Sequence, residues 1–183
     1  MKEDDSSSSK LTMIVGVVAV LAAVAAATSF GFELWSRKQA DRHVVRGAEK
    51  LEHGRPGQAA MEFNRAMELD PLRVDAMHQL GRLYVGQGRL QEADSLLQRA
   101  LEIAPDNPEL HLDLGDIYRR MKDMDRALDI IQRALQIDPQ LALAHHNLGY
   151  LLIVRGEYPE AEASFRKAVE LDADFAMAHY NLG

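Results

Sequence analysis

The sequence predicts an all-α, right-handed solenoid of helix-turn-helix units, preceded by one transmembrane helix. Two observations predict this fold. Pro71, Pro105 and Pro139 recur at intervals of 34 residues, and a period of that length is typical of helical repeat arrays. Upstream of the repeats, residues 11–32 form an uncharged stretch of 22 residues. The chain therefore divides into an N-terminal part and a repeat part.

The N-terminal part is predicted to contain a disordered tail and a membrane helix. Residues 1–10 are polar and rich in serine, so we expect them to be disordered. Residues 11–35 are the predicted transmembrane helix, because the stretch from Leu11 to Phe32 is about 33 Å long as a helix. Trp35 follows at the interface, so Leu11 to Trp35 would contact the membrane. No proline follows before the first repeat, so the helix should continue into it without a linker.

Three further interpretations concern this segment. A cleaved export signal is the alternative, since Ala25, Ala26 and Ala27 suit cleavage, although the acidic tail is atypical of such signals. Basic residues after Trp35 outnumber those before Leu11, which favours a single-pass protein with cytoplasmic repeats over periplasmic or extracellular ones. A stripe of small residues would allow two such helices to form a homodimer. The stripe consists of Ala19, Ala23, Ala27 and Gly31.

The repeat part covers 40–183. Its units are predicted at 40–73, 74–107, 108–141 and 142–175, with a partial unit at 176–183. We expect two helices in each full unit, at 40–53 and 57–69, 74–87 and 91–104, 108–121 and 125–138, and 142–155 and 159–172. Small residues recur in phase, where helices should approach too closely for larger side chains. They are Gly47, Gly81, Gly115 and Gly149; Ala59, Ala93, Ala127 and Ala161; and Ala66, Ala100, Ala134 and Ala168.

The turns show two departures from the pattern. Gly54, Gly88 and Gly156 separate the two helices of their units, whereas Lys122 stands at this position in the third unit. We therefore expect a less ideal turn there. The fourth unit lacks the closing proline and reads Asp172-Ala173, so its second helix is expected to fray or lengthen.

Large apolar residues are also in register between the small ones. They are Leu80, Leu114, Leu148 and Leu182; Tyr84 and Tyr118; and Phe63, Leu97, Ile131 and Phe165. With the Leu-Gly pairs, the alanines and the closing prolines, this pattern resembles the tetratricopeptide repeat over residues 40–183. The resemblance implies a scaffold for protein–protein interaction that has no catalytic activity of its own.

Composition and motifs exclude several classes of function. The chain has no cysteine, which rules out catalytic thiols, disulfides and a lipoprotein anchor. Its net charge of -7 disfavours nucleic acid as a partner. His111, His145 and His179 recur every 34 residues and should lie about 10 Å apart, too far to share a metal. We therefore predict no enzyme activity, no cofactor and no metal site.

A row of polar residues is the candidate binding site. Gln79, Asp113, Asn147 and Asn181 recur on the first helix of successive units. In similar repeat superhelices a row of asparagines binds the backbone of an extended peptide, and the resemblance implies the same use here, since an amide offers both a donor and an acceptor. The resemblance adds Arg82, Arg119, Tyr150 and Ile153 to this peptide-binding groove. It places other residues on the same concave surface: Asp75, His78, Val85, Glu109, Leu112, Asp116, Arg120, Leu143, His146 and Val154.

The predicted function is a membrane-anchored scaffold that binds an extended segment of a protein or peptide partner. Two alternatives stay open. Because the chain stops within the first helix of a fifth unit, it would suit the N-terminal anchor and substrate-recruiting arm of a longer enzyme, such as a glycosyltransferase. It would also suit an envelope assembly factor with repeats outside the inner membrane.

Overall fold

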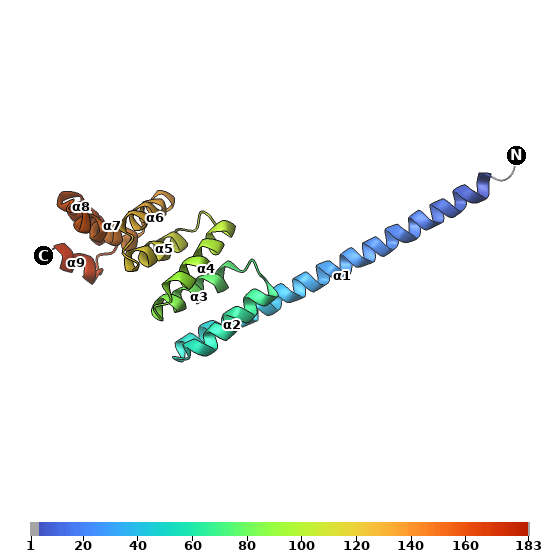
Figure 1. Cartoon of the computed structure of the whole chain (residues 1–183), viewed down its shortest axis with the longest axis horizontal. Coiled ribbons are helices and arrows are strands. Elements are labelled where there is room, and N and C mark those ends of the chain that lie inside the picture. Colours follow the sequence, from blue (N-terminus) through green and yellow to red (C-terminus); the bar gives the residue numbers. More distant parts are fainter. Residues whose placement is uncertain (1–3, 183) are drawn as a thin grey trace.

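The computed structural model describes the backbone of residues 4–182 and the side chains of residue 26 and residues 28–181. The described backbone is all-α, and its helices pack as successive pairs along a solenoid (Figure 1). The helices are α1 (Asp4–Glu52), α2 (Pro56–Leu69), α3 (Val74–Gly86), α4 (Leu90–Ile103), α5 (Pro108–Arg120), α6 (Met124–Ile137), α7 (Ala142–Arg155), α8 (Tyr158–Leu171) and α9 (Ala176–Leu182). The predicted array of helix pairs is therefore confirmed.

α1 is one unbroken helix that extends away from the solenoid, while its C-terminal part packs on α2 (Figure 1). The expected continuity between Trp35 and Ala40 is thus confirmed. Residues 4–10, predicted to be disordered, are helical instead, because extending an existing helix adds hydrogen bonds without a new nucleus. Residues 1–3 lie outside the described residues.

The predicted membrane location is corrected by the structure. Over the residues whose side chains are described, no helix combines the length and the apolar character that crossing a bilayer requires. In α1 the charged residues Glu33, Arg37 and Lys38 follow one another closely. Residues 11–25, most of the predicted transmembrane helix, lie outside the described side chains, as does most of the stripe expected to form a homodimer.

Each repeat closes around a glycine of its first helix and a large side chain of its second. A Cβ atom on Gly81 would lie 2.9 Å from Leu97, and one on Gly149 would lie 2.8 Å from Phe165. Both distances are well below van der Waals contact, so only glycine fits. The same pairing joins Gly47 to Phe63 and Gly115 to Ile131. The phased glycines are therefore a packing requirement, as predicted.

The phased alanines lie in the core between helices. Ala127 and Ala134 are fully buried, and Ala161 is 2% exposed. The main contacts run from each helix to the next along the chain, with α3 also touching α5. Each unit therefore buries its apolar surface only against its neighbours, as expected for a solenoid.

Turns within the units use a left-handed backbone. Gly54, Gly88 and Gly156 have φ values of 67°, 74° and 79°, and Lys122 has φ 64° at the equivalent position. Lys122 therefore follows the same turn as the glycines, although its Cβ makes this conformation costly.

The second helix of the fourth unit does not fray or lengthen, contrary to the prediction. α8 ends at Leu171, in phase with the other second helices. The reason is that Asp172 ends it as Asp70 and Asp138 end theirs: its Oδ1 accepts a hydrogen bond from the backbone N–H two residues later, at 3.1 Å. The aspartate thus stops the helix without help from proline.

Candidate binding groove

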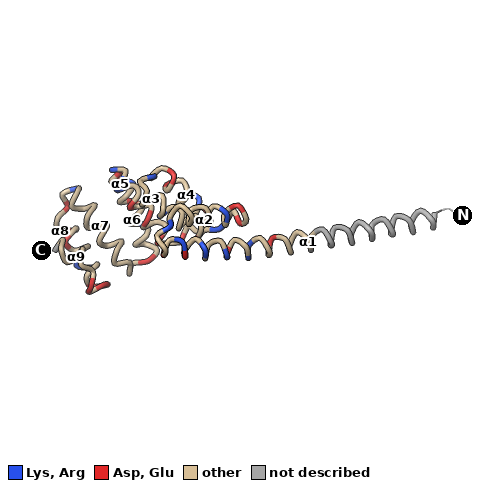
Figure 2. The backbone as a smooth tube through the Cα atoms, turned by 90° about the horizontal axis from the view of Figure 1, so that it is seen from below, with Lys and Arg blue, Asp and Glu red and all other residues tan. Residues whose placement is uncertain are grey.

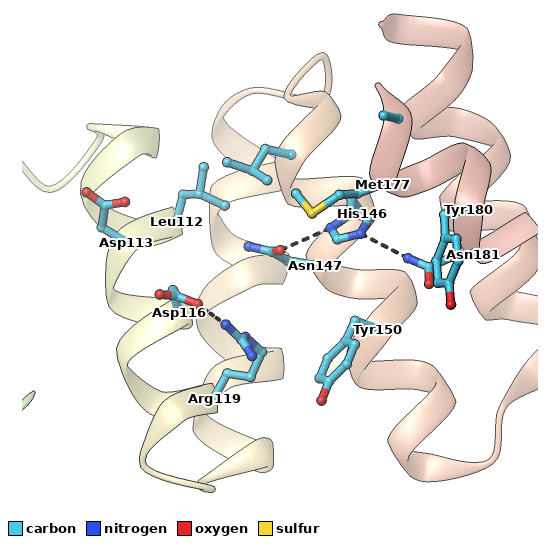
Figure 3. A pocket seen from close by; sticks show the side chains of 12 residues that line it. Leu112, Asp113, Asp116, Arg119, His146, Asn147, Tyr150, Met177, Tyr180 and Asn181 are labelled. Atoms are coloured by element: carbon cyan, nitrogen blue, oxygen red, sulfur yellow. Dashed lines mark hydrogen bonds and ion pairs between the residues drawn. The ribbon is translucent and has the colours of Figure 1, made fainter. Parts of the chain in front are cut away.

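A groove of about 750 Å³ lies along the first helices of the last three units (Figure 3). We call it the α5–α7–α9 groove. Its lining residues come from equivalent faces of the three helices, because each unit repeats the same geometry. They are Leu112, Asp113, Asp116 and Arg119 on α5; Leu143, His146, Asn147 and Tyr150 on α7; and Ala176, Met177, Tyr180 and Asn181 on α9.

The groove brings together five of the eight residues predicted for the peptide site. These are Asp113, Arg119, Asn147, Tyr150 and Asn181. Gln79 and Arg82 lie one unit earlier on α3, where Arg82 approaches Asp113 at 3.7 Å. Ile153 lines a separate, smaller pocket beside Tyr158 and Phe165.

Sequence reasoning missed the contribution of α9. In the partial fifth unit, the sequence analysis places only Asn181 in the groove. The structure adds Ala176, Met177 and Tyr180 of the same unit. The 34-residue period is the signal that identifies Met177 and Tyr180. Tyr180 lies 34 residues after His146, and Met177 lies 34 residues after Leu143.

His146 is buried behind the groove, with a relative exposure of 9%. Its ring centroid is 5.6 Å from that of Phe165 on α8 and 5.1 Å from that of Phe175, the residue before α9. Burial lowers the pKa of His146; the hydrogen bond to Asn147 opposes this shift, and the positive charge of Arg119 adds to it. The imidazole is therefore neutral at pH 7.

Two hydrogen bonds connect His146 to the polar row (Figure 3). Nδ2 of Asn181 donates to Nε2 of His146 at 3.1 Å, and Nδ1 of His146 lies 3.4 Å from Oδ1 of Asn147. A neutral imidazole has one N–H, and placing it on Nδ1 satisfies both contacts. Asn147 then keeps both amide hydrogens, and its Nδ2 points away from His146 toward α5.

The residue 35 positions before each member of the polar row differs from unit to unit. Nε2 of His78 contacts Oδ2 of Asp113 at 2.7 Å, and His146 contacts Asn181 across the same interval of 35 residues. Leu112 occupies this position in the unit before Asn147. Within the described residues, the amide of Asn147 therefore has a single hydrogen bond, the one to His146.

The two sides of the groove differ in polarity. On α5, Asp116 accepts hydrogen bonds from Arg119 and from Nε of Arg120, the latter at 2.6 Å. The guanidinium of Arg119 also lies 5.4 Å from the ring centroid of Tyr150. On the opposite side, Tyr150, Met177 and Tyr180 are 40%, 56% and 87% exposed. The charged side is thus paired within the protein, and the apolar side is open.

The phased histidines outside the groove have a structural role. Nε2–H of His111, His145 and His179 donates to the carbonyl oxygen six residues earlier, at 2.8, 2.9 and 2.8 Å. These acceptors belong to the turn that precedes each first helix. The histidines therefore fix the junctions between units. His43, in the same phase, instead contacts Glu62 at 2.7 Å.

Charged residues of both signs are interspersed over the repeats (Figure 2). The α5–α7–α9 groove is larger than the pocket that Ile153 lines. Paired helices in series with such a groove define the class of protein: an α-solenoid scaffold for protein–protein interaction.

Family profiles agree with this class. A tetratricopeptide repeat profile matches residues 50–111 and 85–146, another tetratricopeptide repeat profile matches 130–163, and a TPR repeat profile matches 151–183. The chain belongs to the tetratricopeptide repeat family. Members of this family generally act as scaffolds rather than as enzymes.

Several solved structures share the fold. The MamA crystal structure is 23% identical with a TM-score of 0.67, and the match covers 74% of this chain and 80% of that one. PilF of Pseudomonas aeruginosa is 21% identical with a TM-score of 0.74, covering 80% and 67%. YrrB, described as a TPR protein with an unusual peptide-binding site, is 25% identical with a TM-score of 0.64, covering 76% and 72%. No curated protein matches the chain by sequence.

Proposed function

We propose that the protein binds an extended peptide segment of a partner protein in the α5–α7–α9 groove. The observation that carries this proposal is the amide of Asn147, which offers two hydrogens to the groove beside an open apolar wall. An extended peptide has backbone groups without internal partners, and each one that loses water on binding needs a new partner. The Asn147 amide supplies one to a peptide carbonyl.

The apolar wall would hold a large side chain of the same peptide. Leu143 and Tyr150 are 43% and 40% exposed, and Met177 extends the surface onto α9. The volume of about 750 Å³ is within the ~300–1,000 Å³ usual for ligand pockets. Aromatic residues such as Tyr150 combine a large contact area with a polar end and often dominate binding.

The comparison with YrrB supports a peptide as the class of ligand. That protein is described as having a peptide-binding site, and its repeats superpose on most of this chain. The alternative of a recruiting arm for a longer enzyme has no specific observation in the described residues that favours it.

The proposal is tested with the full chain and a phage-displayed random peptide library. A selected peptide is synthesised, and its affinity is measured by fluorescence polarisation for wild type, Asn147→Ala and Tyr150→Ala. Losing one hydrogen bond should cost about 0.5–1.5 kcal/mol for Asn147→Ala, and Tyr150→Ala should cost at least as much.

Gln132→Ala is the matched control, because Gln132 is an exposed amide on α6 and does not line the groove. It should bind like wild type. Equal affinity of all four proteins would place binding elsewhere and overturn the proposal.

A further inference from the structure

We infer that His146 is a positioning residue that orients the amides of Asn147 and Asn181, so that the groove offers a hydrogen-bond donor in the fourth unit and an acceptor in the fifth. The inference rests on the proposed function. It specifies which backbone groups of the bound peptide are recognised: a carbonyl at Asn147 and an N–H at Asn181.

The orientation follows from the single proton of a neutral imidazole. Nδ2 of Asn181 can only donate, so Nε2 of His146, 3.1 Å away, must accept. The N–H of the ring is then on Nδ1, which faces Oδ1 of Asn147 at 3.4 Å. With the hydrogen on Nδ1, turning the Asn147 amide would oppose two donors, so its Nδ2 stays directed at the groove.

The surroundings of His146 leave little room for water to replace these bonds. The ring is 9% exposed and lies between Phe165 and Phe175. An amide turned against this tautomer would leave a nitrogen of the buried His146 ring without a partner, which is unfavourable. Each asparagine therefore keeps one fixed end: Asn147 offers N–H groups, and Asn181 retains its Oδ1.

The groups around the ring keep it neutral. Arg119 of α5 is the charged residue that acts on His146, and its positive charge opposes a second proton. The other neighbours are Asn147 on α7, Phe165 on α8, Phe175 before α9 and Asn181 on α9, and none of them titrates. The hydrogen-bond pattern of the groove is therefore maintained at neutral pH.

His78 provides an internal control. It occupies the same repeat position as His146, two units earlier, but its partner requires the other tautomer. Its Nε2 lies 2.7 Å from Oδ2 of Asp113, and a carboxylate only accepts. His78 must therefore carry hydrogen on Nε2, whereas His146 must carry it on Nδ1.

The first experiment reads the tautomer directly and needs no ligand. The full chain is labelled with ¹⁵N-histidine, and long-range ¹H–¹⁵N spectra are recorded at about pH 7.5, above the ordinary histidine pKa of about 6.5. His146→Leu and His78→Leu assign the signals. We expect His146 with hydrogen on Nδ1 and His78 with hydrogen on Nε2. Hydrogen on Nε2 of His146 would overturn the inference and leave the proposed function intact.

The second experiment reads the pattern through a peptide selected from the phage library on the wild-type chain. Each backbone nitrogen is methylated in turn, and every derivative is measured against wild type and His146→Leu. Leu112 occupies the same phase in the preceding unit, so leucine suits this position of the fold.

We expect one methylation to weaken binding to wild type about tenfold, as loss of one good hydrogen bond would, and to have less than about twofold effect on His146→Leu. Equal sensitivity of both proteins would contradict the inference. If no peptide binds the wild type, the proposed function fails, whatever the tautomer.

Discussion

Leu112 stands one unit before Asn147 at the position from which His78 and His146 contact the polar row in other units. A leucine side chain cannot hydrogen-bond, so it leaves the Asn147 amide available. Asp113 and Asn181 are instead contacted by the histidine 35 residues before them. The leucine at this position thus leaves the donor end of the Asn147 amide open to the groove.

Leu112→His is therefore predicted to weaken peptide binding. The new imidazole would hydrogen-bond Asn147 and compete with a peptide carbonyl, at a cost of about 1 kcal/mol of affinity. Fluorescence polarisation with a library-selected peptide measures the change. Leu112→Met, which keeps the site apolar, serves as the control and should bind like wild type; a histidine variant that binds equally well would contradict this account of Asn147.

Stability should depend on pH through His146. Its pKa is lowered by burial, so between that value and about 6.5 the unfolded chain binds more protons than the folded one. The free energy of unfolding therefore falls as the pH falls through this window. Urea unfolding at about pH 7.5 and about pH 5.5 should show a smaller decrease for His146→Leu than for wild type. Parallel decreases in the two proteins would argue against a neutral, buried His146.

Gly149→Ala should destabilise the fourth unit. The added Cβ would lie 2.8 Å from Phe165, which is 1% exposed and has little room to move. Overpacking of this kind costs about 1–3 kcal/mol and outweighs the gain of up to ~1 kcal/mol in helix propensity. Chemical denaturation measures the net loss. Gly86→Ala is the control, because apart from its chain neighbours and its own helix backbone no described atom lies within 4 Å of its Cβ position, and it should not destabilise.

Lys122→Gly should stabilise the third unit. Lys122 has φ 64°, a conformation that costs a residue with a Cβ about 1–2 kcal/mol, against about 0.5–1 kcal/mol of extra chain entropy lost by glycine. A net gain of roughly 0.5 kcal/mol follows from these figures. Thermal unfolding compares Lys122→Gly with Lys122→Ala, which keeps the strain. A rise in melting temperature for the alanine variant alone would contradict the argument from φ.

The repeat period was sufficient to predict the helix pairs and their core. Glycine and alanine recur because each unit repeats one packing geometry, so a local pattern determines a local contact such as Gly149 against Phe165. The prediction for the end of α8 is wrong, because the turn made by Asp172 ends the helix where the other units also have a proline.

The candidate site was less accessible from sequence. The row containing Asn147 was visible as a period, but its availability depends on what the neighbouring unit places beside it. Leu112 and His146 had been assigned to the concave surface without these roles, and Tyr180 was not assigned at all. Such contacts join residues 35 positions apart on different helices, and only the assembled units show them.

Because α1 is unbroken, the number of residues along it sets the direction of its side chains relative to the groove. A helix turns about 100° and rises about 1.5 Å per residue, and α1 has no joint at which that rotation could be absorbed. One residue inserted between Phe32 and Ala40 would swing the exposed Phe30 and Phe32 about 100° around the helix axis relative to the groove. Four inserted residues would nearly restore the direction of these side chains and move them about 6 Å farther from the groove along the helix axis. The length of α1 and the direction of its exposed side chains therefore cannot be changed separately.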